Sequence, residues 1–132
     1  MNWQHIPFTI QRKDHNDISI LFISGRMESA DLTRLKQELR QLTEQRRLRL
    51  ILDFSELVTV SSLTMAGLVL EAESYRAHGG EMKLAGVSRE IMSVVQMLKL
   101  DERVEVQPDV VAAIKSMSGA GSSKSTDPVA AK

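Results

Sequence analysis

The chain has 132 residues, of which 42% are hydrophobic and 26% are charged, a composition typical of one soluble globular domain. Its 17 basic and 17 acidic side chains balance, so no overall field attracts nucleic acid or an acidic membrane. There is no cysteine for a disulfide or a thiolate metal site, and no apolar run approaches the roughly 18 residues that cross a bilayer.

The N-terminal part of the chain predicts a hairpin followed by a helix. Residues 1–7 lack the pattern of an export signal, so we expect a cytoplasmic protein without membrane insertion. Apolar and polar residues alternate over 8–12 and 18–24, on either side of the turn formers at 14–17. Gly25 should end the second strand, and Ser29 should cap a helix. The apolar residues of that helix recur at the spacing of one buried face: Leu32, Leu35, Leu39 and Leu42.

The central stretch, residues 48–70, predicts a buried strand, a short connector and a second helix. The strand is the apolar run that ends at Asp53 and Phe54, and the helix opens at Ser61 and Ser62. Glycines at 79 and 80 stop this helix. Its buried face should consist of Met65, Leu68, Val69, Ala72 and Tyr75.

The rest of the ordered chain repeats the alternation of strand and helix. We expect strands at 81–85 and around 104–106, a helix capped by Ser88 over 88–98, and a last helix after Pro108. Val110, Val111 and Ile114 should pack inward from that helix. Residues 118–132 are predicted to form a flexible tail after a domain at 1–117. The order ββαβαβαβα predicts an α/β fold with a mostly parallel or mixed central sheet and about four helices packed against it.

Polar residues that carry chemistry in other proteins are expected to be structural or exposed here. We interpret Asp53 as a turn former, and the basic cluster of Arg46, Arg47 and Arg49 as a solvated helix end. His5, His15 and His78 fall in predicted loops or termini, without the spacing of metal ligands on a helix. Phosphate-binding glycine loops and a serine-hydrolase elbow are both missing from the sequence. We therefore expect no cofactor, no metal and no catalytic residue.

Two adjacent hydroxyls, Ser61 and Ser62, open the second helix. Capping a helix requires only one of them and contributes roughly 1 kcal/mol. The second serine, beside the apolar Leu63, allows a kinase to modify a hydroxyl within a docking surface. A phosphate there would bring about −1.5 to −2 charges into an apolar contact and oppose binding of a partner. The pattern therefore indicates a docking surface that phosphorylation can switch off.

From Phe8 to Met117 the sequence resembles the STAS domain family, the sulphate-transporter and anti-sigma-factor-antagonist domains. Residues 25–28, Gly-Arg-Met-Glu, match the family's Gly-x-x-Asp element, and residues 79–82, Gly-Gly-Glu-Met, match its Gly-Gly turn. Residues 86–106 are similar to its third helix and last strand. Counting back from Gly79, the family's D-S-S-G-L-G loop falls on residues 61–66. Ser61 then replaces the aspartate, Ser62 takes the place of the phosphorylated serine, and Thr64 replaces the first glycine.

The resemblance implies an anti-sigma factor antagonist of a bacterial partner-switching pathway that regulates transcription. It implies that the unphosphorylated chain binds an anti-sigma factor serine kinase, that phosphorylation at Ser62 (alternatively Ser61) releases it, and that a cognate phosphatase restores binding. The expected contact surface comprises Glu28, Ser29, Ser61, Ser62, Leu63, Thr64 and Met65. We expect a signalling protein that is a monomer when free, does not contact nucleic acid directly and is not an enzyme.

Two alternatives remain open. The first is a non-phosphorylated STAS scaffold, or an accessory subunit of a membrane lipid-transport complex. The second is a small enzyme of unrecognised type, which a pocket with strongly perturbed acids would favour.

Overall fold

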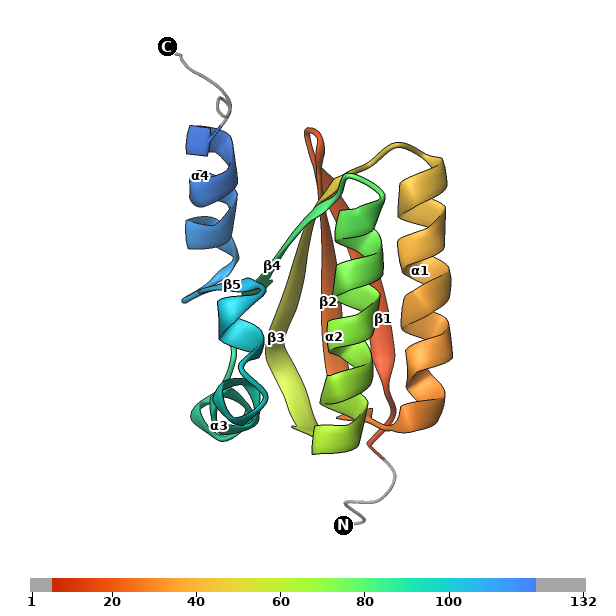
Figure 1. The fold of residues 1–132 in the computed structure, drawn as a ribbon, viewed down its shortest axis with the longest axis vertical. Helices are drawn as coiled ribbons and strands as arrows, with labels where there is room; N and C mark the ends of the chain where they lie inside the picture. Colours follow the sequence, from red (N-terminus) through yellow and green to blue (C-terminus); the bar gives the residue numbers. More distant parts are fainter. Residues whose placement is uncertain (1–5, 121–132) are drawn as a thin grey trace.

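The computed structural model describes residues 6–120, which form one five-stranded sheet with four α-helices (Figure 1). The strands are β1 (Thr9–His15), β2 (Ile18–Met27), β3 (Arg49–Val60), β4 (Glu81–Ala85) and β5 (Glu105–Gln107). The helices are α1 (Leu32–Glu44), α2 (Ser62–Ala77), α3 (Arg89–Met97) and α4 (Val110–Ala120), with short 3-10 turns η2 (Ser29–Asp31) and η3 (Leu100–Glu102). This order confirms the predicted ββαβαβαβα alternation.

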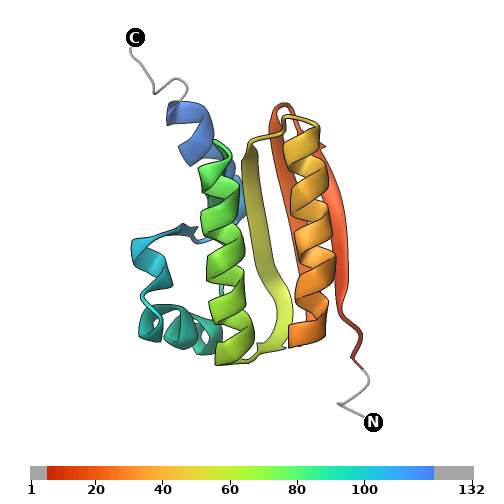
Figure 2. The ribbon, with the colours of Figure 1, turned by 45° about the vertical axis from the view of Figure 1, so that its right-hand side comes forward.

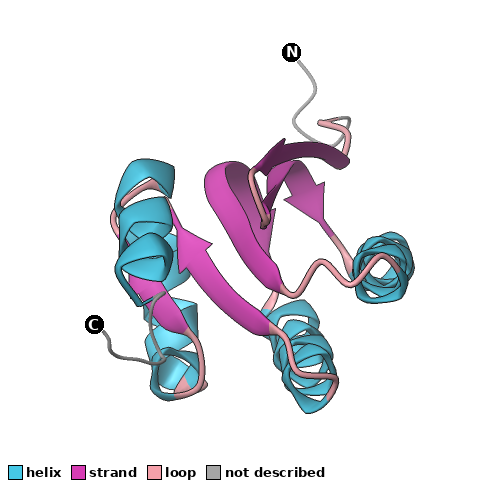
Figure 3. Cartoon of the chain, turned by 90° about the horizontal axis from the view of Figure 1, so that it is seen from above, coloured by secondary structure: helices cyan, strands magenta, loops and turns pink. Residues whose placement is uncertain are grey.

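The sheet is mixed, as expected. Its strands lie in chain order, β1 runs antiparallel to β2, and β2 to β5 are parallel. Helices α1, α2 and α3 pack on one face, whereas α4 packs on the opposite face (Figure 3). Figure 2 shows α1 and α2 side by side along the sheet, each returning the chain to the next parallel strand.

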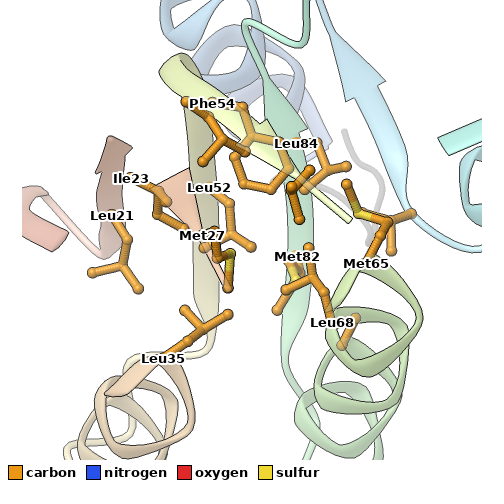
Figure 4. Close-up of a cluster of buried hydrophobic side chains, with 14 of the residues drawn as sticks. Leu21, Ile23, Met27, Leu35, Leu52, Phe54, Met65, Leu68, Met82 and Leu84 are labelled. Atoms are coloured by element: carbon orange, nitrogen blue, oxygen red, sulfur yellow. The ribbon is translucent and has the colours of Figure 1, made fainter. Parts of the chain in front are cut away.

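The main core lies between the sheet and helices α1 to α3. Phe54 and Leu52 of β3 occupy its centre and are almost fully buried. Figure 4 shows how side chains from the strands and both long helices converge there: Leu21, Ile23, Met27, Leu35, Leu52, Phe54, Met65, Leu68, Met82 and Leu84. The smaller core under α4 contains Ile18, Ile20, Ile51, Ala85, Ala113 and Met117.

The predicted connector between Phe54 and Ser61 does not exist, because β3 continues to Val60. Two register shifts against β2 place extra residues on β3, and each such bulge interrupts the alternation of buried and exposed side chains. The interrupted pattern resembles a loop in the sequence. The turn prediction for Asp53 is therefore wrong: this residue lies within β3, is 5% exposed, and accepts a 2.6 Å hydrogen bond from Ser55 Oγ.

Gly25 does not end β2, which continues to Met27. It lies within the strand at φ +89°, a conformation that glycine adopts readily and other residues rarely. The basic cluster matches the prediction only in part: Arg46 is exposed just after α1, but Arg47 is partly buried. Arg47 donates to Ser19 Oγ at 2.6 Å and to Asn16 O at 2.6 Å, and it thereby ties the end of α1 to the first hairpin.

The buried face of the last helix matches the prediction in part. Val110 and Ile114 pack inward as expected, beside the fully buried Ala113 and Met117, whereas Val111 is 60% exposed. Asp109 caps this helix by accepting the N–H of Ala112 at 2.8 Å. The helix also continues to Ala120, beyond the predicted domain boundary at Met117. The predicted tail from residue 121 onward lies outside the described residues.

Tyr75 predicts a loss of stability at alkaline pH. Its side chain is 2% exposed, and its hydroxyl donates to Arg47 O at 2.6 Å. Burial raises the pKa of Tyr75 from 10.0 to about 12, although the nearby Arg47 charge opposes this shift. The folded protein therefore holds this proton to a higher pH than the unfolded chain does. The contribution is fully present below pH 10, and about 2 to 3 kcal/mol is lost as the pH rises from 10 to 12.

Urea unfolding at a series of pH values measures this loss. Tyr75→Phe should be less stable at pH 8 by about 1 kcal/mol, because the hydrogen bond to Arg47 O is missing. Above pH 10 its stability should fall less steeply than that of the wild type. Parallel curves for the two proteins would show that Tyr75 does not cause the alkaline loss.

Candidate functional site

The hydroxyl-rich residues predicted to form the docking surface lie at one end of the sheet. The parallel strands β2 and β3 end side by side, with Met27 opposite Val60. Each strand leads directly into a helical element, η2 or α2, and both α1 and α2 begin at this end of the sheet (Figures 1 and 2). Glu28 and Ser29 line the same hollow as Ser61 and Thr64 at the start of α2. The tertiary structure thus brings together two segments that are about thirty residues apart in the sequence.

The segment after β2 is held by Glu28 and Asp31. The backbone N–H of Glu28 donates to Asp31 Oδ2 at 2.8 Å, and the N–H of Asp31 donates to Glu28 O at 2.8 Å. The prediction that Ser29 is an N-cap is wrong, because Glu28 is the N-cap of η2 and Ser29 is the first residue of that turn. The Ser29 side chain is exposed and oriented toward α2, where its Oγ lies 3.3 Å from Thr64 Oγ1.

Ser61 is the N-cap of α2. Its Oγ accepts the backbone N–H of Thr64 at 3.1 Å and donates to Thr64 Oγ1 at 2.9 Å. Ser62 occupies the first position of the helix and is exposed. Within residues 6–120, its hydroxyl forms no hydrogen bond like those that hold Ser61. The structure thus identifies Ser61 as the capping serine, which the sequence alone leaves open.

The remaining predicted surface residues divide by exposure. Leu63 is 73% exposed, a high value for a leucine, and it adjoins Ser62 on the outer side of α2. Thr64 and Met65 are only 1% and 0% exposed, and Met65 points into the main core (Figure 4). In this conformation, the side chains of Thr64 and Met65 support the surface from below and do not form part of it.

A hollow of about 470 Å³ separates the end of β2 from the start of α2. Arg26 is a positively charged residue of its lining, and Arg26 Nη2 lies 3.7 Å from Glu28 Oε2. The lining residues are Arg26, Met27, Glu28, Ser29, Ala30, Thr59, Val60, Ser61 and Thr64. Sequence reasoning missed Arg26 and Thr59 as site residues. The signal for Arg26 was its place in the matched Gly-Arg-Met-Glu element; for Thr59 there was none, because it sits in the unexpected extension of β3.

The histidines and the acidic side chains of the described residues form no cluster for a metal ion. Across residues 6–120, no group of three or more histidine and acidic side chains is arranged to hold a metal ion. His15 ends β1, His78 caps the C-terminus of α2, and His5 lies outside the described residues. A second hollow, of about 510 Å³, lies between α1 and α2. Ser61, Ser62 and Thr64 at the start of α2 are not among the residues that line this second hollow.

The sequence profile of the STAS domain matches residues 9–113, which include every strand and most of α4's first turn. The chain belongs to the STAS domain family. This agrees with the parallel strands, the bulged β3 and the hydroxyl-bearing start of α2 described above. No curated protein matches the chain at a significant level.

Solved structures have the same fold at low sequence identity. An anti-sigma factor antagonist from Mycobacterium paratuberculosis superposes with a TM-score of 0.73 at 17% identity, over 83% of this chain and 93% of that one. A variant of RsbS from Moorella thermoacetica gives 0.72 at 14% identity, over 89% and 98%. The phosphorylated form of the Bacillus cell fate determinant SpoIIAA gives 0.64 at 14% identity, over 84% and 99%. These similarities establish the STAS fold. In residues 6–120, no helix is both long and apolar enough to span a membrane.

Proposed function

We propose that this STAS protein is an anti-sigma factor antagonist that binds an anti-sigma factor serine kinase and is released when Ser62 is phosphorylated. The observation that carries the proposal is the exposed Ser62 side chain, which lies between the N-cap residue Ser61 and the exposed Leu63. Solved structures of SpoIIAA in both phosphorylated and unphosphorylated forms support it by analogy.

The geometry of Ser62 suits an acceptor of phosphate. A kinase must approach the hydroxyl in line with the terminal phosphate of ATP, which requires an exposed and mobile acceptor. In the transfer, Ser62 Oγ gives its proton to a base of the kinase and forms a bond to the terminal phosphorus of ATP, as the bond from that phosphorus to the β-phosphate oxygen breaks and ADP leaves. The product phosphate lies at the N-terminus of a 16-residue helix, where free N–H groups and the helix dipole stabilise negative charge. Modification should therefore leave the folded state of the STAS domain intact.

The same charge opposes the partner. Leu63 offers an apolar contact beside Ser62, and the exposed Glu28 and Ser29 lie at the same end of the sheet. Burying a phosphate dianion against an apolar surface requires loss of its hydration without compensation. In this scheme the STAS protein is a binding module and a substrate of the kinase, and a phosphatase returns it to the binding form. Its place of action is the cytoplasm, and it is a monomer when free.

Intact-mass measurement tests the proposal directly. The protein is purified from the cells that produce it, with Ser62→Ala and Ser61→Ala variants in parallel, and weighed before and after phosphatase treatment. We expect a phosphate-sized mass difference in the wild type and in Ser61→Ala, and none in Ser62→Ala. Absence of phosphate under all growth conditions, even with the kinases of those cells overproduced, would overturn the switch. The result would then favour the constitutive scaffold or the lipid-transport subunit.

A further inference from the structure

Three hydroxyls from three segments of the chain meet at the proposed docking surface, and one of them is buried. Ser29 comes from η2, Ser61 from the residue between β3 and α2, and the buried Thr64 from the first turn of α2. Thr64 Oγ1 lies at the centre, 2.9 Å from Ser61 Oγ and 3.3 Å from Ser29 Oγ. Thr64 is only 1% exposed, so its hydroxyl depends on these partners in place of water.

Ser61 and Thr64 are joined by two hydrogen bonds of opposite direction. Ser61 Oγ accepts the Thr64 N–H and gives its own proton to Thr64 Oγ1. Thr64 Oγ1 and Ser29 Oγ share a further hydrogen bond, in which either hydroxyl can be the donor. Each hydroxyl has one proton to donate, so the proton of Ser61 is already used within the fold. A phosphoryl group attached to Ser61 would have to break this bond and displace the cap of α2.

We propose that Thr64 is a positioning residue that directs phosphorylation to Ser62 and away from Ser61, and that also holds η2 against the start of α2. This inference rests on the proposed phosphorylation of the STAS protein. The buried Thr64 hydroxyl does not touch the kinase; it fixes the rotamer of Ser61 and so withdraws that hydroxyl from competition. Ser62 points outward one residue later and stays free for the transfer.

Thr64→Val separates the hydroxyl from the shape of the side chain. Valine fills the same buried space but cannot accept the Ser61 proton or reach Ser29, whereas Thr64→Ser keeps the hydroxyl and should behave as wild type. In protein from the producing cells, fragmentation mass spectrometry measures how phosphate divides between Ser61 and Ser62. We expect Thr64→Val to raise the share on Ser61 about fivefold, the factor that corresponds to one ordinary hydrogen bond.

Amide hydrogen exchange of the unphosphorylated protein gives a measurement that needs no kinase. In Thr64→Val, the amide of residue 64 and those of residues 28–31 should exchange about fivefold faster. Ser29→Ala should accelerate exchange at residues 28–31 alone and leave the site of phosphorylation at Ser62. Because Ser29 is exposed, this variant should fold even if Thr64→Val does not.

The outcomes distinguish this inference from the proposed function. If the wild type carries phosphate on Ser62, and Thr64→Val changes neither the site nor the exchange, the role of Thr64 is wrong and the switch stands. If Thr64→Val does not fold, unchanged exchange at residues 28–31 in Ser29→Ala overturns the bracing role. If neither the wild type nor any variant carries phosphate, the proposed phosphorylation switch is wrong. Faster amide exchange in Thr64→Val would then still support the proposal that Thr64 holds η2 against the start of α2.

Discussion

Replacing Gly25 by alanine should lower the free energy of unfolding by about 3 kcal/mol. Gly25 lies inside β2 at φ +89°, and a Cβ atom built there would lie 1.8 Å from Pro7 O. The carbonyl oxygen belongs to the backbone that enters β1, so it cannot move aside as a flexible side chain would. The cost therefore combines a left-handed backbone with a steric clash in the sheet.

Gly79→Ala is the matched control. Gly79 has nearly the same backbone angle, φ +90°, but the nearest atom to an added Cβ is Leu48 Cδ1 at 3.8 Å, an ordinary contact. We expect only the conformational cost, about 1 kcal/mol. Urea unfolding of both variants measures the difference. Equal losses in the two variants would show that the clash with Pro7 O adds nothing to the cost of alanine at Gly25.

Ser62→Asp should affect folding and partner binding in opposite directions. A carboxylate at the first position of α2 interacts favourably with the helix dipole, so the free protein should gain a few tenths to about 1 kcal/mol. In the complex, the same charge would be buried beside Leu63, at a cost of about 3 kcal/mol or roughly 100-fold in affinity. Thermal unfolding and calorimetric titration with the serine kinase of the same cells measure the two effects.

Two variants control for the charge and its place. Ser62→Asn has the shape of the aspartate without its charge and should bind the kinase as the wild type does. Val111→Asp places a carboxylate at a 60% exposed position on α4, on the opposite face of the sheet, and should leave the affinity unchanged. If Ser62→Asp binds as tightly as Ser62→Asn, negative charge at this position is not what releases the partner.

The sequence predicted most elements because their apolar spacing is local. The buried faces of α1 and α2 follow the expected residues closely, since a helix must bury a stripe at the spacing of three and four. The cap at Ser88 is confirmed by the N–H of Ile91, 3.2 Å from Ser88 Oγ. The prediction for β3 failed after Phe54 because the bulges shift the pattern. The bulges arise from the pairing of β3 with β2, and the local sequence of β3 does not predict that pairing.

The site was predicted in part for the same reason. Ser61 and Ser62 stand out in the sequence as two hydroxyls where a cap needs one, but only the hydrogen bonds show that Ser61 is the cap. Thr64 was expected on the docking surface, and its burial follows from the rotation of α2 against the sheet. The family resemblance placed Thr64 over a glycine, so it offered no role for a hydroxyl at that position.

By itself, the sequence determined the α/β class, the order of the elements, the STAS family and the presence of a hydroxyl-rich start to α2. These depend on periodicity, turn residues and short motifs, which act over a few neighbouring residues. Only the tertiary structure decided that Ser29 meets Thr64, that Arg26 lines the hollow and that Ser62 is the free serine. These features depend on the register of β2 against β3 and on how each helix is rotated on the sheet. Packing of distant segments sets both, so no single stretch of the chain encodes them.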